Sequence, residues 1–401
     1  MRYLFVHRAM PGQFGHLASY LAGNGHEVVF LTQSSAPPPR GVRAIRYRRR
    51  RDPAASTHHY LQSTEAAILN AQAVARACEA LKSRGFVPDA ALAHPGWGEG
   101  LYLKDVLPTT RLVDYCEFFL RAEGADVGFY PDETVDLELA CRLRTRNAIL
   151  LLALDAADRG LSPTEWQRSV HPPEYQPKIS VVFDGVDAER ARPDPTATFT
   201  TPSGLRLAHG DPVVTYVARD LEPYRGFPNF VRALPKVLDA VPRAQVLIVG
   251  GDGVSYGRRP PSGGTWREHM AAEIPLDPSR VHFLGRLSYD DYLRVLQVSR
   301  VHVYLTVPFV LGWSAMEALS AGCLVVGSDT APVREVIEDG KNGLLADLNE
   351  PAAIAERIVE ALRHPERYEQ VRARARATIL GRYDLPTTLP LLQGVLDGRT
   401  G

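Results

Sequence analysis

The chain has 401 residues, more than one hydrophobic core commonly supports, so we expect two domains of similar size. Its 46 lysine and arginine residues balance its 46 aspartate and glutamate residues, so net charge gives no reason to expect a nucleic acid partner. The four cysteines show no metal-ligand spacing, which favours a reducing, cytoplasmic location. The first residues lack the hydrophobic stretch of a signal peptide, and no apolar run is long enough to span a bilayer.

The first half of the sequence alternates predicted strands with predicted helices. Strands are expected at residues 3–6, 26–31, 90–93, 111–115 and 179–182, and helices at 16–23, 66–80 and 135–155. A strand, a helix and a second strand at this spacing predict a right-handed βαβ unit. The first half is therefore expected to form a Rossmann-like domain.

A basic segment follows the second predicted strand. It contains six arginines, Arg43, Arg46, Arg48, Arg49, Arg50 and Arg51. Such a run is most often a solvated surface, and this is the default interpretation. The alternative is peripheral contact with the anionic inner face of a membrane.

Residues 184–201 are polar, contain proline and lack periodicity, which predicts a linker between the two halves. The alternation of predicted strands and helices then starts again. Strands are expected at residues 213–217, 245–249, 281–284, 301–305 and 324–326, and helices at 227–241, 314–321, 351–362 and 368–380. The second half is thus a second Rossmann-like domain.

The segment from residue 303 to residue 345 carries the strongest functional signal. Pro308 ends a predicted strand, Gly312 gives the following loop backbone freedom, and a helix starts near Ser314 with Glu317 in its first turns. Helix starts at the carboxyl ends of parallel strands favour phosphate. The segment therefore predicts a site for a nucleoside diphosphate, although the helix dipole alone also favours a carboxylate such as Glu317.

Two arginines support this interpretation. Arg219 follows the strand at 213–217, and Arg225 precedes the next helix. A single arginine at a strand end is usually a solvated charge, but two at this spacing suit a diphosphate, which arginine binds with two parallel hydrogen bonds.

These motifs resemble the retaining glycosyltransferases of family 4, which have the GT-B fold. The matching residues are Arg219, Arg225, Gly312, Glu317, Ala318, Ala321, Gly322, Glu335, Gly340, Asn342, Gly343 and Leu344. The resemblance implies two Rossmann-like domains that face each other across a cleft. We expect an acceptor-binding domain at 1–185, a nucleotide-sugar-binding domain at 186–380, and a helix in 381–401 that returns to the first domain.

The resemblance also implies an activity, which is transfer of a hexose from a nucleotide-diphosphate sugar to a saccharide, lipid-linked or small-molecule acceptor without a metal or cofactor. Arg219 and Arg225 would neutralise the diphosphate, and Glu317 would hold the ribose. The donor-binding residues expected with them are Gly12, Gly250, Gly285, Arg286, Gly312, Trp313 and Ser314. Phe309 stands where the family has a glutamate that contacts the donor sugar.

The first domain is expected to supply contacts to the acceptor or the sugar. The candidates are His16, His94, Trp97, Tyr115 and Glu117, with Phe309 from the second domain. Two alternatives stay open, another GT-B enzyme such as a nucleotide-sugar hydrolase or epimerase, and a non-catalytic nucleotide-sugar binder. A dehydrogenase of the Rossmann type is disfavoured because the first loop lacks the G-x-G-x-x-G pattern.

Overall fold

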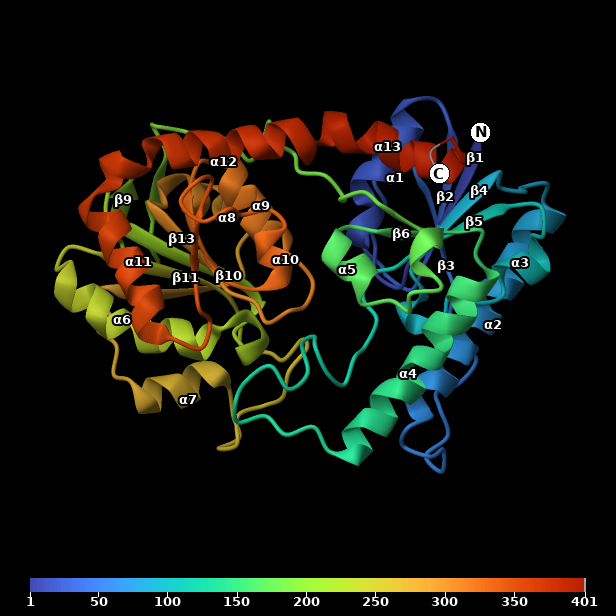
Figure 1. Ribbon diagram of the computed structural model, residues 1–401. Helices are drawn as coiled ribbons and strands as arrows, with labels where there is room; N and C mark the ends of the chain where they lie inside the picture. Colours follow the sequence, from blue (N-terminus) through green and yellow to red (C-terminus); the bar gives the residue numbers. More distant parts are fainter. Residues whose placement is uncertain (400–401) are drawn as a thin grey trace. The chain divides into compact units, whose positions relative to one another are not determined.

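A computed structural model of the protein describes residues 1–399, which form two units (Figure 1). Unit 1 contains residues 1–185 and the chain from residue 385, and unit 2 contains residues 186–384. Each unit is built on one parallel sheet with helices packed against it. The expectation of two Rossmann-like α/β domains is therefore confirmed. No helix among residues 1–399 combines the length and the apolar character that crossing a membrane requires.

The sheet of unit 1 has seven parallel strands in the order β3-β2-β1-β4-β5-β6-β7. Their bounds are β1 Arg2–Val6, β2 Glu27–Thr32, β3 Arg43–Arg46, β4 Ala90–Ala93, β5 Arg111–Tyr115, β6 Arg159–Ser162 and β7 Ile179–Val181. The inner strands are apolar runs because helices cover both faces of the sheet. Strand β6 was not predicted, since its sequence, Arg-Gly-Leu-Ser, is short and lacks a β-rich pattern.

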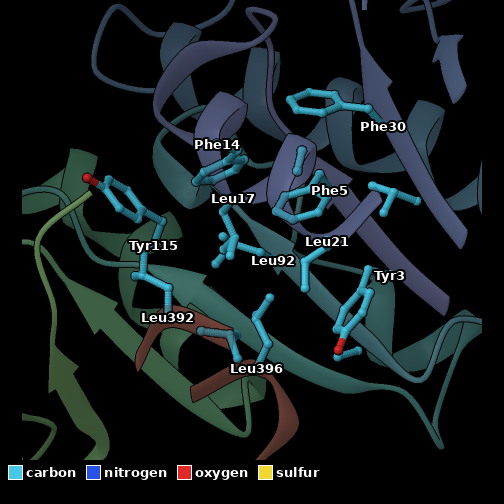
Figure 2. Close-up of a cluster of buried hydrophobic side chains, with 14 of the residues drawn as sticks. Tyr3, Phe5, Phe14, Leu17, Leu21, Phe30, Leu92, Tyr115, Leu392 and Leu396 are labelled. Carbon is cyan, nitrogen blue, oxygen red and sulfur yellow. The ribbon is translucent and has the colours of Figure 1, made fainter. Parts of the chain in front are cut away.

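The helices of unit 1 are α1 Gly15–Gly23, α2 Gln62–Ser83, α3 Leu103–Val106, α4 Leu137–Ala156, α5 Glu165–Ser169 and α13 Leu385–Asp397. Short 3-10 turns are η1 Gly12–Phe14, η2 Pro95–Trp97 and η3 Gln176–Lys178. Figure 2 shows Leu392 and Leu396 of α13 in the core beside Tyr3 and Leu21. The hydroxyl of Tyr3 also donates a hydrogen bond to Asp397 at 2.7 Å. The last helix thus completes the core of unit 1, and it begins at Leu385, a few residues later than expected.

The sheet of unit 2 has six parallel strands in the order β12-β11-β10-β13-β14-β15. Their bounds are β10 Val213–Asp220, β11 Gln245–Gly251, β12 Val281–Gly285, β13 Val301–Tyr304, β14 Leu324–Ser328 and β15 Leu344–Ala346. The helices are α6 Phe227–Ala240, α7 Trp266–Glu273, α8 Tyr289–Val298, α9 Trp313–Ser320, α10 Ala331–Arg334, α11 Pro351–Arg363 and α12 Glu369–Arg382, with 3-10 turns η4 Pro223–Arg225 and η5 Pro365–Tyr368.

The predicted linker at residues 184–201 is wrong for most of its length. Val186, Ala188 and Ala191 are buried, and β8 (Thr198–Thr200) pairs antiparallel with β9 (Arg206–Ala208). The guanidinium of Arg376 on α12 donates to the carbonyl oxygens of Ala188 and Ala191, each at 3.3 Å. The segment looks like a linker in sequence because its small apolar residues alternate irregularly with charged ones, and a partner distant in sequence holds its backbone.

The strand order reverses direction once in each sheet. In unit 1 the reversal lies between β1 and β4, and in unit 2 it lies between β10 and β13. At such a switch point the loops after the two strands diverge, which leaves room for a ligand beyond the carboxyl ends of the strands. The loops after β1, β4, β10 and β13 are therefore the first places to look for a functional site.

Candidate functional site

The switch point of unit 2 is bridged by Arg225, which ends the turn η4 after β10. Its Nη1 lies 3.1 Å from the Tyr304 hydroxyl, 3.0 Å from the Thr306 hydroxyl and 3.0 Å from the carbonyl oxygen of Val310. All three acceptors belong to β13 or to the loop after it. Burial lowers the pKa of Arg225, but the hydroxyls of Tyr304, Tyr256 and Tyr216 outweigh burial and raise it, so the side chain is a fixed positive charge.

An aromatic group surrounds this charge. The guanidinium carbon of Arg225 lies 5.6 Å from the ring centre of Tyr256 and 5.9 Å from that of Phe309. Phe309 is 9% exposed and lies 4.9 Å from Tyr256 and 5.5 Å from Tyr224, measured between ring centres. The position at which a glutamate was expected in the family pattern is thus an apolar wall beside Arg225.

Tyr304 connects Arg225 to the start of helix α9. Its hydroxyl accepts a hydrogen bond of 2.6 Å from the backbone N–H of Gly312, the residue before the helix. A Cβ at position 312 would lie 3.1 Å from that hydroxyl oxygen, which explains why glycine suits this position. Trp313, the first helical residue, is 41% exposed, and Ser314 is half-buried. The predicted donor-binding residues 312–314 therefore do form a helix start next to Arg225.

Glu317 lies on the same helix, and its carboxylate is held by two tyrosines of α8. The hydroxyl of Tyr289 donates to Oε1 and the hydroxyl of Tyr292 donates to Oε2, both at 2.7 Å. Burial raises the pKa of Glu317 above its ordinary value, although both hydrogen bonds act in the opposite direction. A carboxylate offers about four lone-pair positions, so two remain for a ligand hydroxyl.

The other two arginines predicted in unit 2 differ in their surroundings. Arg219 is exposed and forms no ion pair with any residue in the range 1–399. Arg286 lies 2.9 Å from Asp220, and its side chain is 68% exposed. Both charges can therefore turn toward a ligand at the carboxyl edge of the sheet. Arg225 supplies a charge fixed by three acceptors, Arg219 supplies an exposed charge, and Arg286 supplies an exposed charge paired with Asp220.

Gly250 and Gly285, which were predicted to bind the donor, also have structural reasons to be glycine. A Cβ at Gly250 would lie 2.8 Å from the carbonyl oxygen of Ala218, and Gly285 has a φ of +64°. These observations explain the glycines without a ligand. Their donor contact stays a prediction.

Two carboxylates that the sequence did not single out shape the loop after β11. Glu222 is fully buried and accepts hydrogen bonds from the backbone N–H groups of Ser255, Tyr256 and Gly257. Asp220 accepts from the Ser255 hydroxyl, a short contact, and from Arg286. These contacts place Tyr256 beside Arg225. A signal existed in the sequence, since both acidic residues lie in the short segment between the predicted strand at 213–217 and Arg225.

The switch point of unit 1 holds a second polar cluster. His94 follows β4, and its Nε2 donates to Oε2 of Glu117 at 3.1 Å, while its Nδ1 accepts from the N–H of Gly96. The amide of Gln13 donates to Oε1 of Glu117 at 2.8 Å. Burial raises the pKa of Glu117, but the hydrogen bond from His94 and the neighbouring imidazoles and Gln13 outweigh it, and the pKa is lowered. The predicted residues His94 and Glu117 are therefore brought together.

His7 completes this cluster and was missed. It follows β1 directly, and its ring centre lies 5.0 Å from that of His94 and 5.3 Å from that of Trp97. Burial lowers the pKa of His7 to about 4, so the ring is neutral at pH 7. A histidine directly after the first strand of a parallel sheet could have been found from its position alone.

The remaining candidates of unit 1 divide into two groups. Trp97 stacks on His94 at 4.7 Å between ring centres, and Gly12 approaches the ring of His7 so closely that a Cβ would lie 2.8 Å away. Tyr115, in contrast, is buried, and its hydroxyl donates to Asp184 at 2.7 Å. His16 is exposed near the start of α1. The structure thus brings Trp97 and Gly12 to the cluster, and it places the ring centre of Tyr115 5.6 Å from that of His94, at the buried side of the cluster.

The basic segment of unit 1 is partly neutralised. Arg43 lies 3.8 Å from Glu27, Arg49 lies 2.7 Å from Asp52, and Arg51 lies 2.6 Å from Glu65. Arg46, Arg48 and Arg50 are exposed. Strand β3 carries Arg43 and Arg46 of this segment at the edge of the sheet. The exposed arginines agree with the default interpretation, which is a solvated surface.

Within residues 1–399 no three His, Cys, Asp or Glu side chains are grouped as metal ligands.

Two family models match the chain along most of its length. One, described as glycosyl transferase family 4 group, matches residues 24–191, and the other, described as glycosyl transferases group 1, matches residues 200–378. Phosphatidyl-myo-inositol mannosyltransferase of Mycobacterium leprae is 33% identical over 176 residues, which are 43% of this chain and 42% of that protein. Spore coat protein SA of Bacillus subtilis is 27% identical over 206 residues, which are 50% and 53% of the two chains. The matches thus span about half the length of these curated relatives.

Solved structures confirm the fold. Anabaena HepE in complex with UDP-glucose superimposes with a TM-score of 0.69 at 16% identity, covering 99% of this chain and 100% of HepE. Sucrose-phosphate synthase from Thermosynechococcus elongatus gives a TM-score of 0.70 at 16% identity, covering 98% of each chain. The two family models together cover most of the chain. The chain therefore belongs to the group 1 glycosyltransferases of the family 4 group.

Proposed function

We propose that the protein transfers a hexose from a nucleoside diphosphate sugar to a hydroxyl of an acceptor, with retention of the anomeric configuration. One observation carries the proposal, the convergence of Arg225, the start of α9 and Glu317 at the switch point of unit 2. Tyr304 connects Arg225 to Gly312, and Glu317 lies one turn further along the same helix. This arrangement offers positive charge for two phosphates and a carboxylate for a ribose.

The chemistry follows from where charge develops. Breaking the bond between the sugar and the β-phosphate leaves a negative charge on the departing diphosphate, and fixed cations nearby lower the barrier. Arg225 is already held in place by three acceptors, so it requires little reorganisation when that charge forms. Arg219 and Arg286 are exposed and can close on the phosphates. The protein's own cations are thus proposed to act without a metal, and activity should persist in EDTA.

Phe309 is proposed to influence which donor sugar the protein selects. The aromatic wall that it forms with Tyr224 and Tyr256 lies beside Arg225, where a carboxylate would otherwise accept sugar hydroxyls. We propose that sugar selectivity here depends on packing against this wall more than on hydrogen bonds to residue 309. A relative from Corynebacterium glutamicum, 28% identical over 213 residues, is a GDP-mannose-dependent mannosyltransferase, and the HepE structure contains UDP-glucose, so both GDP-sugars and UDP-sugars belong in a donor panel.

We propose that the acceptor binds at the cluster of unit 1, which is formed by His7, Gln13, His94, Trp97 and Glu117. The carboxylate of Glu117 and the imidazole of His94 can orient a hydroxyl, and the indole of Trp97 can pack on a sugar ring. A saccharide, a lipid-linked sugar or a small polyol would satisfy these contacts. Peripheral membrane contact, proposed through the exposed Arg46, Arg48 and Arg50, would place a lipid-linked acceptor nearby.

The test is a panel of UDP- and GDP-sugars monitored for release of the nucleoside diphosphate, with and without a saccharide and lipid acceptor mixture. Release that requires acceptor, with an α-linked product from an α-linked donor by NMR, is the expected result. Equal release without acceptor would instead establish a hydrolase, and conversion of the nucleotide sugar to its epimer without an acceptor would establish an epimerase. Tight binding of the nucleotide without turnover under every condition would establish a non-catalytic binder and overturn the proposal.

A further inference from the structure

Unit 2 contains a cavity at the edge of its sheet opposite the switch point. Its volume is about 660 Å³, within the range of sites that bind small molecules. Arg300 precedes β13 and Gly322 precedes β14, so the cavity opens at the amino ends of these strands. Helix α12 forms one wall. We refer to it as the α12 cavity.

Three arginines line the α12 cavity, namely Arg300, Arg372 and Arg376. All three are half-buried, and in the part of the chain that the structure describes none forms an ion pair with a carboxylate. Arg300 and Arg372 line the same cavity. Burial lowers the pKa of Arg300, the charge of Arg372 acts in the same direction, and Asp211 acts in the opposite one. Two like charges near one another in a partly buried cavity are stabilised by an anion that both can bind.

The arginines differ in how firmly the protein holds them. Arg376 donates to the carbonyl oxygen of Ser320 at 2.6 Å and to those of Ala188 and Ala191, and Arg300 donates to the carbonyl oxygen of Gly210 in a short contact. Both are anchored by backbone groups that neutralise little of their charge. Arg372 has no hydrogen bond to another described residue, so it can turn toward a ligand.

The rest of the lining limits the class of ligand. Glu366 and Glu369 line the cavity and would repel a highly charged polyanion, but their oxygens can accept hydrogen bonds from hydroxyl groups. Pro193, Ala377 and Leu380 give the cavity an apolar surface on which a sugar ring or a polyol can pack. The combination suits one phosphate group attached to a hydroxylated body.

We propose that the α12 cavity binds a phosphate ester of a sugar or polyol, with the phosphate between Arg300 and Arg372. Arginine binds phosphate oxygens with paired hydrogen bonds, and the two residues approach from different elements, which fixes the direction of the ligand. Helix α9 runs from the switch point at Gly312 to the cavity at Ala321 and Gly322. The cavity is thus a separate site that shares one helix with the proposed donor site, and its ligand is not the substrate of the transfer.

The test measures binding of glucose 6-phosphate, glucose and inorganic phosphate to the full chain by calorimetry. Glucose 6-phosphate is expected to bind, inorganic phosphate to bind more weakly, and glucose to give no signal. Arg372→Gln should weaken glucose 6-phosphate at least about 10-fold, because it removes a charged contact to phosphate. Arg374→Gln is the matched control, since Arg374 is exposed on the same helix and does not line the cavity.

Further measurements distinguish a lipid headgroup from a soluble ester as the source of the phosphate, and the choice of variant avoids one that unfolds. Sedimentation with phosphatidylinositol-containing vesicles that is lost in Arg372→Gln would assign the phosphate to a lipid headgroup, whereas binding of the soluble ester alone would assign it to a free metabolite. Because Arg300 anchors Gly210, its variant can unfold, so Arg372→Gln carries the test. Equal affinity of the native protein and Arg372→Gln, or no binding of any phosphorylated probe, would overturn the proposal. Neither result would affect nucleotide binding at the switch point.

Discussion

The two switch points occupy the same place in their sheets but have opposite chemistry. In unit 2 the loops after β10 and β13 are joined by the half-buried cation Arg225, with Arg219 and Arg286 exposed nearby. In unit 1 the loops after β1 and β4 carry neutral or hydrogen-bonded imidazoles, His7 and His94, arranged around the carboxylate of Glu117. A parallel sheet fixes where a ligand is placed, and the side chains after the strands decide its charge. Unit 2 suits an anion, and unit 1 suits hydroxyl groups.

The largest effect on activity should come from removing Arg225, which links the loops after β10 and β13 in unit 2. Arg225→Ala removes the fixed cation and leaves Tyr304, Thr306 and the Val310 carbonyl without their donor. We expect nucleoside diphosphate release to fall ~100- to 1,000-fold, the cost of losing one preorganised charge stabiliser. Unfolding in urea should also show a loss of ~1–3 kcal/mol from unsatisfied acceptors.

Arg225→Lys is the matched control for this bridge. An ammonium group has three donors, one for each of the three acceptors, and it keeps the charge. Its activity should fall less than that of Arg225→Ala, because the charge is kept while the planar guanidinium and its paired hydrogen bonds are lost. Native turnover in Arg225→Ala would remove this residue from the reaction.

The carboxylate of Glu317 should govern nucleotide affinity. Glu317→Ala removes the group that Tyr289 and Tyr292 hold in place, so a ribose hydroxyl would lose a charge-assisted acceptor. We expect the Kd of the nucleoside diphosphate to rise ~10- to 100-fold by calorimetry, which corresponds to the worth of such a bond. Tyr289→Phe, which keeps the carboxylate, should raise the Kd by a smaller factor. An unchanged Kd in Glu317→Ala would contradict the ribose contact.

The neutral imidazole of His7 predicts an acid-sensitive fold. The pKa of His7 is lowered to about 4 in the folded chain and lies near 6.5 when unfolded. A depressed pKa means that the stability contribution is complete above pH 6.5 and declines as pH falls toward 4. At pH 5 the loss from this residue should be ~2 kcal/mol relative to pH 7.

Urea unfolding at pH 7 and pH 5 measures this loss, and His7→Gln should reduce the difference between the two pH values by a similar amount. His171 is also buried, and its pKa is lowered to about 4, so part of the pH dependence should remain in that variant. A pH dependence that is the same in His7→Gln and in the native protein would show that His7 is charged or exposed.

The smallest effect should come from the carboxylate of unit 1. Glu117→Gln keeps the size of the side chain but removes the charge that accepts from His94 and Gln13. We expect turnover to fall about 10-fold while the Kd of the nucleoside diphosphate stays the same, since orientation of the acceptor is lost and donor binding is not. A change in Kd with unchanged turnover would place the nucleotide in unit 1 and reverse the comparison.

Much of this arrangement could be predicted from the sequence. Continuous apolar runs and punctuating glycines placed the inner strands of both sheets except β6, and the position of Gly312 and Glu317 on one helix start followed from the local pattern. Contacts between distant residues could not be predicted. The hydrogen bonds of Tyr289 and Tyr292 to Glu317, and of Glu222 to the loop at Tyr256, join segments whose meeting depends on the tertiary fold.

Two other misses have causes that lie outside the missed segments. Strand β6 is too short and too poor in β-branched residues to stand out, and its place in the sheet is set by its neighbours β5 and β7. The segment at 184–201 has polar composition, yet Arg376 fixes its backbone from α12. Amino-acid composition indicates which side chains prefer solvent. It cannot show that this segment is held by hydrogen bonds from its backbone carbonyls to a residue distant in sequence.

The most direct test of the account is calorimetric titration of UDP and GDP into the native protein, Glu317→Ala and Glu117→Gln. We expect one nucleotide per chain, an affinity that falls at least about 10-fold in Glu317→Ala, and an affinity that is unchanged in Glu117→Gln. Binding that survives in Glu317→Ala and disappears in Glu117→Gln would contradict the assignment of the nucleotide to unit 2.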